Sequence, residues 1–270
     1  MTLWRTIGHA NVLKLDGEAF WTAMLNSLDG SDEATAAETY SELGFQSSTR
    51  VSMWKRAPDR QLVHEWIDRA LEVSKAESPA RAKALIAHAT IVGDDAGMSA
   101  RQASELADRL GDDELRSWAW GARSFAALAR DDYEEAFRWA LPRVELAPHL
   151  DDPDHVSLIY FFASSPYVAT CRLDDARRLA EAHDAVTATL SAHHRLHAAW
   201  LLVDIERVTG RWNDVHALTS RAEEAVAANV ATPCVTSALS LLACALAAAI
   251  RGERQESRRL ERAADELAMT

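Results

Sequence analysis

Three closely spaced histidines, His193, His194 and His197, are the residues best suited to chemistry in this sequence. His183 precedes them by about one helix, and Asp204 follows two turns later. His194 and His197 would share a helix face because they are three residues apart, and imidazoles at this spacing can bind a transition metal. No paired glutamate or convincing third ligand accompanies them. We therefore expect no metal, and a metal-dependent enzyme that uses this cluster stays the second alternative.

Other catalytic motifs are incomplete. His64-Glu65 is followed by Asp68 where a zinc protease helix needs a second histidine. None of the four lysines follows a glycine, so the chain has no phosphate-binding loop of the Gly-x-x-x-x-Gly-Lys type. Ser164 and Ser165 lack the strand-turn-helix context of a nucleophile elbow. We expect no catalytic residue, no cofactor and no enzymatic activity.

The elements that would position these residues follow a repeating pattern. A turn residue is followed by a large residue, two acidic or amide residues, a small residue and a large apolar residue. The copies begin at Asp131, Cys171, Gly210 and Gly252, so they are 40, 39 and 42 residues apart. Acidic residues in a first helical turn face unpaired backbone N–H groups, which marks helix starts. A fixed period of this size is typical of helical repeats.

Caps, breakers and periodicity together predict helices and no strand. The expected helices lie near 18–28, 32–54 (with a break at Gly44), 59–77, 79–92, 99–110, 113–130, 132–147, 153–170, 172–190, 193–209, 212–229, 233–250 and 254–268. Short links between them favour antiparallel neighbours. The expected fold is all-α, an α-solenoid of roughly six antiparallel helix pairs. Residues 1–30 form an N-terminal segment, in part helical, and residues 31–270 form one helical-repeat domain. Pro142 and Pro166 should bend or interrupt their helices.

Several short sequence segments resemble segments of known protein families. Cys171-Arg172-Leu173-Asp174-Asp175-Ala176 and Gly210-Arg211-Trp212-Asn213-Asp214-Val215 are similar to tetratricopeptide-class repeats, although the period is near 40 rather than 34. Met53-Trp54-Lys55-Arg56 and Ser78-Pro79-Ala80-Arg81 resemble the C-terminal helical region of bacterial adenylate cyclase-type and signalling ATPase regulators. This resemblance implies a scaffold or signal-relay role. The implied partners are a protein or peptide, including ATPase, cyclase or DNA-binding domains of a parent chain.

Net charge and composition further limit the classes of binding partner that we expect. The net charge is -12 and the pI about 5.3, which disfavours direct binding to nucleic acid. The arginines between Arg251 and Arg262 alternate with glutamates, as on a solvated helix face. Residues 232–250 are uncharged but rich in small side chains, which favours a helix buried on several sides over a membrane span. Three cysteines in no known motif and no visible signal peptide predict a cytoplasmic protein.

The expected function is a non-catalytic scaffold for protein–protein interaction or signal relay. The first alternative is a small-ligand sensor with a pocket where Pro142 and Pro166 disturb the stack. In repeats of this class the first helix of each pair lines a groove, and aromatic and arginine side chains are favoured at protein contacts. The expected outward-facing groove residues are Trp120, Arg123, Tyr160, His194, His197 and Arg207.

Overall fold

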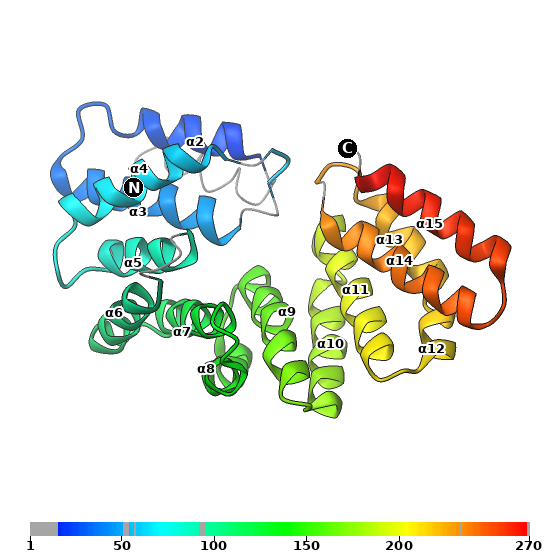
Figure 1. Cartoon of the computed structure of the whole chain (residues 1–270). Helices are drawn as coiled ribbons and strands as arrows, with labels where there is room; N and C mark the ends of the chain where they lie inside the picture. Colours follow the sequence, from blue (N-terminus) through cyan, green and yellow to red (C-terminus); the bar gives the residue numbers. More distant parts are fainter. Residues whose placement is uncertain (1–15, 51–53, 57, 92–95, 233, 269–270) are drawn as a thin grey trace. The chain divides into compact units, whose positions relative to one another are not determined.

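The computed structural model describes residues 16–50, 54–56, 58–91, 96–232 and 234–268. Within these ranges every regular element is a helix and none is a strand, so the prediction of an all-α protein is confirmed (Figure 1). The chain divides into two compact units, Met1–Leu146 and Ala147–Thr270. This division differs from the expected boundaries at residues 30 and 31. The helix within residues 1–30 buries Phe20 and Met24 completely and packs against the helix that follows it.

The first unit consists of helices, and most of them pack against the next one in the sequence. Its elements are α2 Gly17–Asn26, α3 Glu33–Thr49, α4 Arg60–Val73, α5 Pro79–Ile91, α6 Ala96–Leu110, α7 Asp113–Leu128 and α8 Tyr133–Leu146. Several begin at an aspartate whose carboxylate accepts a backbone N–H of the first turn, as Asp32 does from Thr35 at 2.8 Å and Asp112 from Leu115 at 3.0 Å. These bonds satisfy donors that the helix itself leaves unpaired.

At three positions where the sequence predicted a possible break, the helix continues. Helix α3 continues through Gly44, where a Cβ atom would lie 2.7 Å from Ile67 Cγ1. The glycine therefore permits close packing of α3 on α4 rather than a break. Pro142 and Pro166 also lie inside continuous helices, α8 and α9, so of the expected bend or interruption the interruption does not occur. Buried neighbours such as Arg143 and Tyr167 hold each helix by tertiary packing, which outweighs the one hydrogen bond that a proline removes.

The second unit follows the same plan. Its elements are the 3-10 helix η2 Ala147–His149, α9 Pro153–Ala169, α10 Leu173–Thr187, α11 Ala192–Val208, α12 Trp212–Ala217, α13 Thr219–Ala228, α14 Val235–Ile250 and α15 Arg254–Ala268. Helix α11 packs against α10, α13 and α14, and α14 packs against α15. The core between α11, α12, α14 and α15 includes Val203, Val215, Cys244 and Leu260, all fully buried.

The four positions at which the sequence pattern begins share one backbone conformation. Asp131, Cys171, Gly210 and Gly252 have φ values of 57°, 58°, 72° and 81°. At each position the next residue's N–H bonds a carbonyl five residues back, as Arg172 does to Tyr167 at 2.9 Å. This arrangement ends one helix and turns the chain into the next. Glycine adopts it without strain, whereas aspartate and cysteine do so at a cost.

Two other expectations need correction. The helix expected over 212–229 is two helices, α12 and α13, because the chain departs from regular helix at Leu218. Helix α14 is not buried on several sides as its composition suggested: one face is packed and the opposite face is exposed. In the described parts of the chain, no helix combines the length and apolar character needed to cross a membrane.

Candidate functional site

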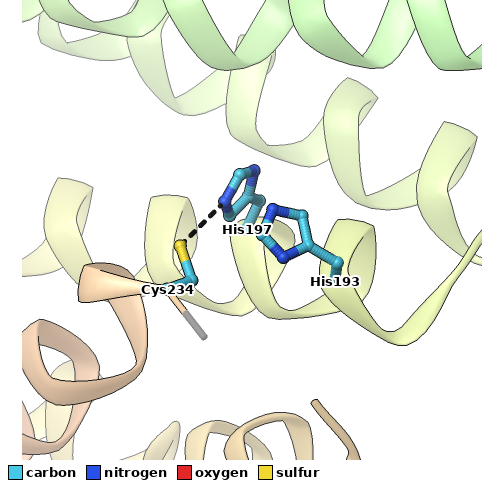
Figure 2. Close-up of side chains that lie close together, drawn as sticks. All are labelled: His193, His197 and Cys234. Carbon is cyan, nitrogen blue, oxygen red and sulfur yellow. Dashed lines mark hydrogen bonds between the residues drawn. The ribbon is translucent and has the colours of Figure 1, made fainter. Parts of the chain in front are cut away.

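Two helical segments of the second unit bring together a histidine pair and a cysteine. Helix α11 carries His193 and His197, which are four residues apart and therefore project from the same face. Cys234 directly precedes α14, which packs against α11. Figure 2 shows the two imidazole rings and the sulfur atom turned toward one another. We call His193, His197 and Cys234 the histidine–cysteine cluster.

The distances within this cluster are short. His197 Nε2 lies 3.4 Å from Cys234 Sγ, and the two imidazole centroids are 4.3 Å apart (Figure 2). One nitrogen of each histidine and the sulfur all lie within 4.8 Å of one another. His193 is 1% exposed and His197 5%, so both rings are closed off from solvent. Phe161 of α9 stacks on His197, with ring centroids 4.2 Å apart and an interplanar angle of 14°.

A hydrogen-bond chain fixes the proton of His193. The Thr232 hydroxyl donates to Asn229 Oδ1 at 2.5 Å, so its oxygen accepts from His193 Nδ1–H at 3.1 Å. Asn229 is held in turn, because its Nδ2 donates to the Thr232 carbonyl at 2.8 Å. His193 Nε2 therefore carries a lone pair. This nitrogen is buried and has no hydrogen-bond partner among the described residues. Such an unpaired group costs about 1–3 kcal/mol.

Burial also fixes the charge of the cluster. Desolvation lowers the pKa of His193 to about 4, with a smaller contribution from nearby His194. Desolvation also lowers the pKa of His197 well below its usual range, reinforced by the neighbouring histidines. The pKa of His183 falls to about 3 for the same reasons, burial first. Both imidazoles of the cluster are therefore neutral near pH 7 and offer lone pairs rather than protons.

His194 does not belong to the cluster, although it lies between its two histidines in the sequence. Its Nε2 pairs with Asp154 Oδ1 at 2.6 Å and its Nδ1 with Ser191 Oγ at 2.7 Å. Both ring nitrogens are thus engaged elsewhere. The expected pairing of His194 with His197 on one face is wrong: the pair that meets is His193 and His197. Asp204 is also engaged elsewhere, because it bonds Arg207 at 2.6 Å.

The expected groove residues fall in different surroundings. Trp120 and Arg123 lie in the first unit, and Tyr160, His194, His197 and Arg207 lie in the second. His194 and His197 are buried, so the expectation that they face outward is wrong. The other four side chains are half-buried. Arg123 stacks on the Trp139 ring, with Cζ 3.5 Å from the ring centroid. It therefore serves packing within its unit.

A second feature of this unit is the exposed face of α14. Its side chains are aliphatic and recur at intervals of three or four residues, which places them along one side of the helix. They are Val235, Leu239, Leu242, Leu246 and Ile250, with exposed fractions of 71%, 38%, 43%, 47% and 52%. We call these five residues the α14 apolar stripe. The helix Val235–Ile250 contains no charged residue.

Arginines of the C-terminal segment form ion pairs with nearby glutamates. Arg259 bonds Glu223 at 2.6 Å and Glu256 at 2.5 Å, and Arg251 bonds Glu253 at 2.9 Å. For Arg259, whose partner Glu256 lies three residues away on α15, the interpretation of the C-terminal arginines as a self-paired helix face is confirmed.

Sequence reasoning missed Cys234, Thr232 and Asn229 as parts of one site. Residues close in space here are separated by nearly constant sequence distances: His194 and Asp154 by 40 residues, and His193 and Thr232 by 39. A search near that spacing from His193 and His197 leads directly to Thr232 and Cys234. No protein-family model matches the sequence, and no match is found among curated proteins.

Proposed function

We propose that this chain is a non-catalytic helical-repeat scaffold that binds a partner protein, as a regulatory or signal-relay part of a larger system. The α14 apolar stripe carries this proposal. Exposed aliphatic side chains are ordinary when scattered, but a continuous stripe on an uncharged helix marks a contact surface. In a helix, intervals of three and four residues match the anchors with which one amphipathic helix binds another.

The occupant we propose is an amphipathic helix of a partner protein with an aliphatic face. Because α14 has no charged side chain, nothing on it selects a charged partner segment. A stable interface between two folded proteins uses roughly 20–30 residues on each side. The stripe has five, so it suits a single bound helix better than a second copy of the chain.

The buried cluster is consistent with a non-catalytic role. His193 and His197 are almost inaccessible, so neither offers a surface on which a substrate could be turned over. The solenoid arrangement and the period near 40 belong to the same proposal. The four identical helix-ending turns and the packing of successive helices support it.

The test is quantitative purification of the tagged chain from its source cell with two matched variants. Leu242→Asp places a charge in the stripe, and Leu62→Asp places one at a similarly exposed leucine, 39% exposed, on α4. We expect one or more proteins to be retained by the parent and by Leu62→Asp and lost with Leu242→Asp. Equal recovery with both variants would refute the stripe as the contact. Circular dichroism checks that both variants are folded.

A second candidate function, a small-ligand sensor, has one observation in its favour. A cleft of about 610 Å³ lies in the first unit between α3 and the turn from α4 to α5. Glu42 and Lys83 form an ion pair at 2.7 Å in its wall, and Gln46 donates to Glu42 at 2.7 Å. The cleft is not at Pro142 or Pro166, where a pocket was expected. Native mass spectrometry should then show a bound metabolite that Lys83→Met removes.

A further inference from the structure

We propose that the second unit binds a zinc ion through His193 Nε2, His197 Nε2 and the sulfur of Cys234. This site goes beyond the proposed partner binding and does not depend on it. Two imidazoles and a thiolate form a donor set that zinc favours, whereas magnesium and calcium prefer oxygen ligands.

The spacing of the donor atoms fits a tetrahedral ion. Zinc–nitrogen bonds of about 2.0–2.1 Å and a zinc–sulfur bond of about 2.3 Å place neighbouring nitrogen and sulfur ligands about 3.6 Å apart. His197 Nε2 and Cys234 Sγ are 3.4 Å apart. All three donors lie within 4.8 Å of one another, so they need to move together only slightly to reach a single ion (Figure 2).

Hydrogen bonds from neighbouring residues orient His193 and can stabilise a Cys234 thiolate. Asn229 and Thr232 hold the proton of His193 on Nδ1, which leaves Nε2 directed to the cluster. Hydrogen bonds of this kind from outer residues are characteristic of metal-bound histidines. Thr236 Oγ1 lies 3.0 Å from Cys234 Sγ and can donate to a thiolate. Nothing else in the described structure explains a buried, unpaired His193 Nε2.

Binding has a simple charge balance. The two imidazoles are neutral and lose no proton. The Cys234 thiol gives its proton to solvent and binds as thiolate, so a dipositive ion and one thiolate leave one net positive charge. Three protein ligands leave a fourth position, which a water molecule would fill. Because Cys234 directly precedes α14, the ion would tie the start of that helix to α11.

The experiment is metal titration of the full chain after removal of metal with a chelator. Zinc is titrated in competition with a chromophoric chelator, and cobalt(II) is added separately as a spectroscopic probe. We expect one ion per chain and a thiolate-to-cobalt charge-transfer band. Cys234→Ser should abolish the band and weaken zinc binding by at least about 100-fold.

Two control variants remove the same residue types from exposed positions of the second unit. Cys171→Ser and His149→Gln should leave the affinity and the cobalt spectrum unchanged, because both side chains are exposed and outside the cluster. His193→Gln provides a second ligand test, and circular dichroism establishes that each variant is folded. Binding that persists in Cys234→Ser, or a parent chain without stoichiometric zinc binding, would overturn the proposal.

Discussion

Thr232→Val should destabilise the metal-free protein, because it removes the hydroxyl that links His193 to Asn229. The substitution keeps the side-chain shape, so almost no cavity forms. Two buried hydrogen bonds are lost, and the His193 N–H and Asn229 Oδ1 are left unpaired. At about 1 kcal/mol for each bond, with a further cost for the stranded groups, the free energy of unfolding should fall by about 2–4 kcal/mol.

The assay is urea denaturation followed by circular dichroism, with Thr209→Val as the matched control. Among the residues that the structure describes, the Thr209 hydroxyl bonds carbonyls of its own helix, at 2.8 and 3.1 Å. Its replacement should cost less than about 1 kcal/mol. In a double-mutant cycle, Thr232→Val should cost less when His193 is already glutamine, because only the bond to Asn229 then remains to be lost.

The same variant has a second readout in zinc binding. Loss of the residue that orients His193 should weaken zinc affinity by about 10–100-fold, whereas Thr209→Val should not change it. If Thr232→Val matched Thr209→Val in both stability and zinc affinity, the hydrogen-bond chain would not hold His193 as proposed.

Three further outcomes are expected of the metal-free protein. The pKa values of His183 and His193, lowered to about 3 and about 4, mean that the unfolded chain takes up protons first as the pH falls below about 6.5. Each of these two histidines should therefore lower the free energy of unfolding by about 1.4 kcal/mol per pH unit, from about pH 6.5 down to its folded pKa. Urea midpoints that are equal at pH 7 and pH 5 would contradict this. Leu260→Ala, at a fully buried position, should cost about 3 kcal/mol in denaturant titrations, and a loss below 1 kcal/mol would show that the core is placed wrongly. Cys171→Gly should stabilise by about 1 kcal/mol because φ is 58° there, and calorimetry should detect a higher Tm.

Local signals predicted the helices well. Ser78-Pro79 and Asp152-Pro153 mark the starts of α5 and α9 at Pro79 and Pro153, because proline at the first helical position loses no hydrogen bond. The helix expected over 233–250 would begin at residue 233, which lies outside the described ranges. In the structure α14 begins at Val235. The division at Leu218 had no glycine or proline to signal it. Helices α12 and α13, on its two sides, both pack against α11 and α14.

The histidine–cysteine cluster could not be predicted from local sequence patterns, because it is formed by contacts between residues far apart in the chain. Spacing alone permits His193 or His194 to pair with His197 on one helix face. Asp154, 40 residues from His194, pairs with His194 Nε2, and His193 is therefore the histidine that meets His197. Cys234 joins the cluster only when α14 packs on α11. The prediction from composition that α14 is buried on several sides was also wrong. An uncharged helix has the same composition whether its second face is buried in the protein or exposed as a contact surface.

The most direct test of the proposed function is photocrosslinking from position 242 in the source cell. A photoreactive phenylalanine analogue replaces Leu242 in the stripe or, as the control, Leu62 on α4. We expect an adduct from position 242 alone, mapped to an aliphatic face of an amphipathic helix in another protein. Adducts with the same proteins from both positions, or none from position 242, would contradict it.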